Sequence, residues 1–317
     1  MTQTLSNSEG STPDRAPIEA FYPGLSPQLL ARVRQLWSAR GLELDAAWHT
    51  AVRTLPGYAA LSRIEGAPSS RPVDLVLLFD QCVIWIEALH AAARCGRDAG
   101  TAGLTTAQWH GLTALSARLT EQVSALRMLA LAGLPMPAMQ IARSISEDVD
   151  MLLVLLVRRK LAERFIACRD VEEASAFWRR HIAGGRAFRT LAEKLYAIGL
   201  DHSANSDYGR WRKDVLTRLG AAVHSNALAT PERSRPGSYL DTDSGLYFAT
   251  FRLHELCAYA QLIKPDLTAS LTAAASGAPR FAGLAGLATP LSAILVEQIE
   301  SLSHAAPADA AGGDAAG

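Results

Sequence analysis

An arginine and a histidine near the end of one predicted helix are the residues of this chain best suited to acid–base chemistry. Arg218 is separated by five residues from His224, in a run that continues to Asn226. An imidazole exchanges protons near neutral pH and a guanidinium holds anions, so the pair could form a small polar site. Ser225 and Asn226 add a hydroxyl and an amide at the same helix end.

The geometry of a helix leaves a plainer interpretation of His224 open. On a straight helix its side chain lies about 120° from that of Arg218. The two converge only if Gly220 loosens the last turn, or if a symmetry-related helix completes the site across a dimer. A histidine at a helix C-terminus also caps the helix and interacts favourably with its dipole.

A polar stripe on an otherwise apolar predicted helix is a second candidate site. Arg143, Glu147 and Asp150 follow one another at spacings of four and three, which places them on one helical face. They form either a structural ion pair or the lining of a cleft whose arginine holds an anion such as phosphate. In the first case Glu147→Ala leaves Arg143 without its partner and destabilises the fold by about 1–3 kcal/mol.

A basic segment interleaved with aromatic residues follows this helix. Residues 158–189 hold nine Arg or Lys against four Asp or Glu, and Arg179, Arg180 and His181 directly follow a Phe-Trp pair. Basic side chains that contact phosphates and rings that stack on bases are how many proteins hold RNA. The alternative is a solvated helical face whose arginines lay their apolar stems over the core.

Several enzyme and cofactor signatures do not occur in the sequence. It contains no Gly-rich phosphate loop ending in Lys-Ser or Lys-Thr and no G-x-S-x-G motif. His254 and Glu255 begin like a zinc-peptidase helix, but Ala258 stands where the second histidine would have to be. We therefore expect no cofactor and no metal.

Composition favours a globular, cytoplasmic protein. The 31 basic and 31 acidic residues cancel, which argues against coating nucleic acid or a membrane by bulk charge. The longest strongly apolar stretch, residues 149–157, is nine residues and too short to span a bilayer, so we expect no membrane partner. The widely spaced cysteines predict free, buried thiols in a reducing cytosol: Cys82, Cys95, Cys168 and Cys257.

Apolar residues recur at helical spacing through most of the chain, and strand-like alternation is almost absent. This pattern predicts helices over residues 27–39, 44–55, 73–95, 106–132, 137–167, 171–182, 186–198, 208–224, 246–263 and 290–303. Long consecutive helices joined by short connections pack as antiparallel neighbours. The sequence therefore predicts one all-α multi-helix bundle over residues 20–304, with disordered tails at residues 1–19 and 305–317.

Short motifs along the predicted helices carry a resemblance to known proteins. They are Ala-Leu-Ala-Gly at 130–133, Ala-Arg-Ser-Ile-Ser-Glu at 142–147, Lys-Leu-Ala-Glu-Arg-Phe at 160–165, Phe-Trp-Arg-Arg-His at 177–181, and the Val-His-Ser run at 223–225. Together they resemble a large bacterial group of all-helical proteins related to the HEPN superfamily, over roughly residues 75–263.

This resemblance implies a helical bundle that often dimerises and, in many members, a metal-independent ribonuclease of toxin or defence systems. It implies that Arg218 steadies the phosphate and that His224 acts as acid or base in the chemistry of the RNA 2′-hydroxyl. The chain departs from the active pattern at Leu219 and Gly220, because the position after the arginine is usually polar.

Three functions fit these observations. A ribonuclease needs Arg218 and His224 accessible in one cleft, whereas a non-catalytic module that binds a nucleotide or RNA needs the stripe at Arg143 to line a pocket. A scaffold needs a large exposed apolar patch instead. The expected partners are RNA or a nucleotide, a second copy in a homodimer, and a cognate protein.

Overall fold

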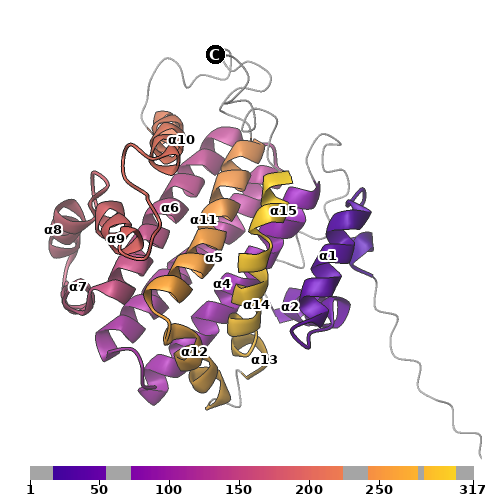
Figure 1. The fold of residues 1–317 in the computed structure, drawn as a ribbon, viewed down its shortest axis with the longest axis horizontal. Helices are drawn as coiled ribbons and strands as arrows, with labels where there is room; N and C mark the ends of the chain where they lie inside the picture. The colour runs from indigo at the N-terminus through magenta and orange to yellow at the C-terminus, as the bar shows by residue number, and fades with distance from the viewer. Residues whose placement is uncertain (1–16, 55–72, 224–241, 278–281, 305–317) are drawn as a thin grey trace, which may run out of the picture.

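The fold is all-α, as the sequence predicts. The structure is a computed structural model, and it describes residues 17–54, 73–223, 242–277 and 282–304. No strand occurs within these ranges, and their helices pack together as a bundle (Figure 1). The parts of both tails at residues 1–16 and 305–317 lie outside the described residues.

Four long helices form the centre of the bundle: α4 (Val73–Ala99), α5 (Thr106–Leu131), α6 (Pro135–Val157) and α11 (Thr242–Ile263) (Figure 1). α5 packs between α4 and α6, and α11 packs on α6 and α4. The connections from α4 to α5 and from α5 to α6 are short, so these neighbours are antiparallel. A capping box formed by Thr105 and Gln108 begins α5.

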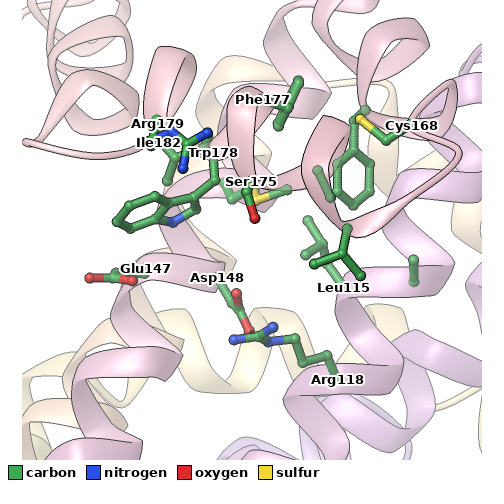
Figure 2. Close-up of a pocket in the computed structure, with 15 residues that line it drawn as sticks. Leu115, Arg118, Glu147, Asp148, Cys168, Ser175, Phe177, Trp178, Arg179 and Ile182 are labelled. Carbon is green, nitrogen blue, oxygen red and sulfur yellow. Dashed lines mark hydrogen bonds and ion pairs between the residues drawn. The ribbon is translucent and has the colours of Figure 1, made fainter.

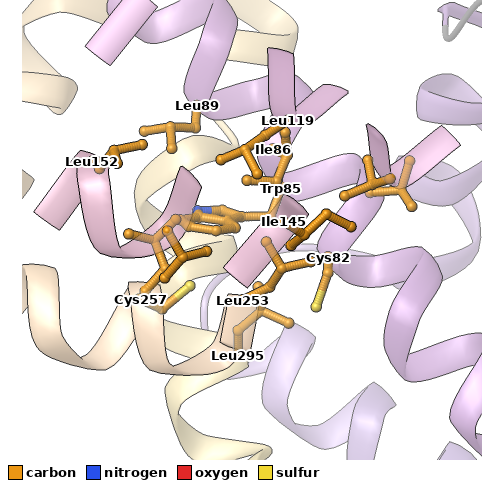
Figure 3. Packing of buried hydrophobic residues seen from close by; sticks show 14 of the residues in the cluster. Cys82, Trp85, Ile86, Leu89, Leu119, Ile145, Leu152, Leu253, Cys257 and Leu295 are labelled. Atoms are coloured by element: carbon orange, nitrogen blue, oxygen red, sulfur yellow. The ribbon is translucent and has the colours of Figure 1, made fainter. Parts of the chain in front are cut away.

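The core is formed by apolar side chains that these helices and a later helix, at residues 288–297, point toward one another. Figure 3 shows Trp85 of α4 among Leu119, Ile145, Leu253 and Leu295, all of them buried. Deleting one such side chain to alanine typically costs about 2–5 kcal/mol, because a cavity remains. The closely packed central helices therefore form a rigid base on which the outer helices pack.

α4 is long and apolar enough to cross a membrane, a feature that the sequence analysis missed. Among the described helices it alone meets that criterion, and 78% of its most apolar window is buried by its neighbours. Such burial is typical of a helix in the core of a protein, because a helix that is apolar all round needs an apolar environment on every side. The arrangement is consistent with a soluble protein.

The prediction of one helix over residues 137–167 is wrong at its C-terminal end. α6 ends at Val157, Arg158 has φ −111° and ψ 86°, and α7 (Arg159–Ile166) starts in a new direction. The break leaves carbonyls at the end of α6 without helical partners. The Gln108 side chain of α5 satisfies two of them, donating to the carbonyls of Leu155 (3.2 Å) and Leu156 (2.7 Å).

The shorter helices from the two ends of the chain pack on α4, on α11 or on one another: a 3₁₀ helix (Ile18–Ala20), α1 (Pro27–Ser38), α2 (Leu44–Thr54), α12 (Leu267–Ser276), α13 (Ala282–Ala285), α14 (Ala288–Glu297) and α15 (Ile299–His304). The helices α12 and α13 were not predicted from the sequence. Ile18 falls within the predicted disordered tail, but the structure packs it against the rest of the chain. It is buried, and its backbone N–H donates to Asp45 (2.9 Å).

An outer group of helices lies along α5 and α6: α7, α8 (Val171–His181), α9 (Arg186–Tyr196) and α10 (Asp207–Val223) (Figure 1). α9 and α10 pack on α6, α7 packs on α5, and α8 packs on α7. The four cysteines are free, as predicted, although Cys168 is only half-buried. Two cavities lie between this outer group and the central helices.

Candidate functional site

A cavity of about 750 Å³ lies between α6, α9 and α10. Its wall also includes residues 202–204 of the loop between α9 and α10. Four basic side chains and no Asp or Glu line it: Arg143, Arg189, Arg212 and Lys213. A volume of this size is typical of small-molecule sites, which range over about 300–1,000 Å³. The cavity is therefore large enough for an organic anion.

The N-terminal end of α9 borders this cavity. Gly184 and Gly185 both have left-handed backbones, with φ of 65° and 73°, and both line it. Gly185 is the N-cap residue of α9, and no side chain caps the helix there. The first N–H groups of a helix have no partners within it and carry partial positive charge, so they attract anions. Backbone and side chains thus contribute charge of the same sign.

The four basic residues differ in how far their charge is compensated. Arg143 pairs with Glu147 at 3.4 Å, and Arg212 pairs with Asp150. Arg189 and Lys213 are exposed, and neither forms an ion pair with a carboxylate of the described residues. Their positive charge is therefore available to a ligand.

Arg212 forms the inner wall of the cavity. Its guanidinium carbon lies 3.7 Å from the centre of the Phe188 ring, a cation–π contact. Arg212 is only 6% exposed, and its Nε has no hydrogen-bond partner among the described residues. Leaving such a buried donor unmet costs about 1–3 kcal/mol. Nδ1 of His202, on the same wall, also lacks a partner in that part of the chain.

A buried polar network fixes this inner wall. Asp150 of α6 pairs with both Arg212 of α10 and Arg252 of α11. Arg252 is fully buried and also pairs with Glu255. Burial opposes its positive charge, but the Glu255 and Asp150 carboxylates outweigh burial and raise the pKa of Arg252.

The network continues from Glu255 to the cavity wall through a tyrosine. The hydroxyl of Tyr259 donates to Glu255 (2.8 Å) and is hydrogen-bonded to Nε2 of His202. Burial and the Glu255 charge raise the pKa of Tyr259 above its ordinary value. Because that hydroxyl proton is given to Glu255, Nε2 of His202 is the donor to Tyr259. Arg212 and His202 are thus joined through the core.

Sequence reasoning missed most of this network. Arg212, Arg252, His202 and Tyr259 were not candidates, and Glu255 was considered only as part of a zinc motif. The available signal was a charged pair three apart, Arg252 and Glu255, inside an apolar helix, where unpaired charges are too costly to bury.

The predicted polar stripe is divided by the structure. Asp150 points into the buried network, whereas Arg143 lies against α10, where its Nη1 donates to the carbonyl of Leu216 (3.1 Å). A Cβ at Gly220 would lie 2.6 Å from the same Nη1, so this glycine permits the close approach of Arg143. Glu147 lies outside the lining of the cavity.

The exposure of the Arg143–Glu147 pair lowers the loss of stability expected for Glu147→Ala. The side chains of Arg143 and Glu147 are 30% and 39% exposed, and Arg143 keeps its bond to Leu216 without Glu147. Exposed helical pairs contribute about 0.3–0.5 kcal/mol. We now expect Glu147→Ala to change the free energy of unfolding by about 0.5 kcal/mol or less in urea titrations. A loss above about 2 kcal/mol would show that the pair is buried in solution.

Arg218 is placed on α10 away from the cavity lining. Its guanidinium pairs with Asp214, one turn earlier on the same helix, and its side chain is half-buried. His224, Ser225 and Asn226 lie outside the described residues. The cavity extends along α10 as far as Ala221, and Gln140 of α6 donates to the carbonyl of Ala222 (2.7 Å).

The three candidates from the basic segment lie on α8, apart from this cavity. Arg179 lines a second cavity, of about 720 Å³, between α8 and the helices α5 and α6 (Figure 2). Arg180 is exposed, and His181 packs its ring against Phe177 at 5.0 Å. Partial burial and the charges of Arg164 and Arg180 lower the pKa of His181.

Three of the predicted binding residues therefore line one of the two cavities. Arg143 lies in the basic cavity, and Glu147 and Arg179 lie in the second one. A comparison of the chain with protein-family models, curated proteins and solved structures finds no match to it, so its function has to be argued from these two sites.

Proposed function

We propose that the cavity between α6, α9 and α10 binds the phosphate group of a ribonucleotide, either free or within RNA. The observation that carries this proposal is the lining of four basic side chains without an acidic one, at the uncapped start of α9. Phosphate is held by guanidinium and ammonium groups and by helix N-termini, through charge-assisted hydrogen bonds. The protein is then a HEPN-like, cytoplasmic binding module.

The shape of the cavity supports a ligand larger than inorganic phosphate. Lys213 and Arg189 stand at the exposed side of the lining, while Phe188 and Arg212 form its inner wall. The phosphate meets the two exposed cations and the end of α9, and the sugar and base extend toward Phe188, where a flat ring finds apolar contact. About 750 Å³ accommodates a whole nucleotide.

Calorimetric titration of adenosine 5′-monophosphate and of adenosine tests the proposal, because the two differ only in the phosphate. We expect the monophosphate to bind at least about tenfold more tightly, since each lost charge-assisted hydrogen bond costs about 1.5–3 kcal/mol. Equal affinities, or no binding of either at millimolar concentration, would overturn the proposal. An oligoadenylate without terminal phosphates separates the two sources. If the oligoadenylate binds more tightly than the monophosphate, the natural ligand is RNA. If it binds more weakly, the natural ligand is a free nucleotide.

A metal-independent ribonuclease of defence or toxin type is the second candidate. It rests on the spacing of Arg218 and His224 and on the extension of the basic cavity to Ala221, three residues after Arg218. In such a reaction the 2′-hydroxyl attacks the phosphorus and the 5′-oxygen leaves with a proton, so the histidine exchanges protons and the arginine stabilises the added charge.

Incubation of the protein with a mixed RNA pool in the presence of chelator tests this second candidate. Cleavage by wild type that falls about a hundredfold or more in both Arg218→Ala and His224→Ala supports it. RNA left intact by the wild-type protein removes the ribonuclease and leaves the binding module. That the chain forms a homodimer or binds a cognate protein stays a prediction.

A further inference from the structure

The second cavity, between α8 and the pair α5–α6, is lined mainly by apolar side chains. Leu115 of α5, Met151 of α6 and Phe177 of α8 lie on three of its sides. On α8, Trp178 is 43% exposed and Val171 75% exposed, although both face the cavity. Apolar side chains that border a space of about 720 Å³ gain free energy when an apolar ligand removes them from water.

Two carboxylates mark one wall of this cavity. Glu147 and Asp148 are adjacent on α6, and Figure 2 shows both on the side opposite the Trp178 indole. Asp148 is buried, and Arg118 is its ion-pair partner at 2.6 Å. The Arg118 side chain is itself 60% exposed, so water screens its charge and it compensates the buried carboxylate only in part.

The titration of Asp148 agrees with this incomplete compensation. Burial raises its pKa to about 6, the neighbouring Glu147 acts in the same direction, and Arg118 and Gln122 of α5 oppose the shift. The fourth charged side chain of the lining, Arg179 of α8, is exposed to solvent. A ligand that brings a positive charge to this wall supplies Asp148 with a second partner.

We propose that this cavity binds an organic cation with an apolar body, an aryl or alkyl ammonium, with its charge between the Trp178 indole and the carboxylates of Asp148 and Glu147. An indole face attracts a cation through its π electrons, and a desolvated carboxylate attracts it by charge. The apolar body fills the space toward Leu115, Met151 and Phe177. This proposal is independent of phosphate binding in the basic cavity.

Three probes of similar size and different charge test whether the cavity prefers a cation. They are phenyltrimethylammonium, its neutral isostere tert-butylbenzene, and the anion benzenesulfonate. In calorimetry at pH 7.5 we expect the ammonium to bind about tenfold more tightly than the isostere, a difference typical of one cation–π contact in a desolvated site. The sulfonate should bind most weakly. A neutral or anionic probe that binds as tightly as the ammonium would overturn the proposal, and so would no binding of any of the three.

Single substitutions in the lining test where the ammonium binds. Asp148→Asn and Trp178→Leu should each weaken the ammonium about tenfold, whereas Glu172→Gln should not, because Glu172 is an exposed carboxylate of α8 outside the lining. Glu147→Gln, at a more exposed position, serves if Asp148→Asn fails to fold. An equal effect of the Glu172 control, or no effect of the lining variants, would place the ligand elsewhere.

The pH dependence gives a second readout. Lowering the pH from 7.5 to 5 protonates Asp148, whose pKa is about 6, and should weaken the ammonium while leaving tert-butylbenzene unchanged. In Asp148→Asn the ammonium should lose this dependence. A parallel fall for both probes in the wild-type protein would contradict the assigned role of the carboxylate.

Discussion

Arg252→Met is expected to lower the free energy of unfolding by about 3–5 kcal/mol, because it leaves the buried Glu255 carboxylate without its ion-pair partner and Asp150 with Arg212 alone. Arg252 pairs with Asp150 and Glu255 and also donates to the hydroxyls of Tyr208 (3.0 Å) and Ser146 (3.1 Å). Methionine keeps the apolar stem and removes only the charged group. Urea titration at pH 7 measures the change.

An exposed arginine supplies the control for this prediction. Arg210 pairs with Asp207 on the surface of α10, so Arg210→Met should stay within about 0.5 kcal/mol of wild type. An Arg252→Met protein as stable as that control would contradict the buried network.

The double variant Arg189→Glu with Lys213→Glu is expected to lower the affinity for adenosine 5′-monophosphate by about a hundredfold or more. Each wild-type side chain contributes a charge-assisted contact of about 1.5–3 kcal/mol, and each glutamate repels the phosphate instead. Both positions are exposed, so the fold should be retained, which circular dichroism checks. Calorimetry measures the affinity.

Arg164→Glu with Arg180→Glu is the matched control for this variant. It makes the same change in net charge at exposed positions of the basic segment, outside the basic cavity. If the cavity holds the phosphate, the control should lose no more than about threefold, through weakened long-range attraction alone. Equal losses in the two double variants would instead assign binding to the basic segment as a whole.

The long helices could be predicted from the sequence because their apolar residues repeat with the helical period over many turns. The break at Arg158 could not, since the side chain that satisfies the freed carbonyls is Gln108, about fifty residues earlier. α12 was missed because its sequence alternates Leu and Ala with Ser and Thr, which have weaker helix propensity than Ala or Leu.

The candidate site could be predicted only in part, because its residues come together through tertiary packing. Arg143 was found from its place on a polar helical stripe, and the structure does put it on a cavity wall. Arg189 was noticed only as the last basic residue of the segment at 158–189, and Lys213 belonged to no pattern. An exposed basic residue on one helix has the same sequence signature whether or not a second helix faces it. Their pairing depends on how α9 and α10 pack on α6.

The most direct test of phosphate binding is to locate the phosphate itself. Crystals soaked with adenosine 5′-thiophosphate carry one additional sulfur on that group, which anomalous diffraction can place. The proposal predicts an anomalous peak in the cavity between the start of α9 and Lys213, within contact of Arg189. A nucleotide bound with its sulfur peak at any other place, or calorimetric binding that the Arg189→Glu and Lys213→Glu variant retains in full, would contradict it.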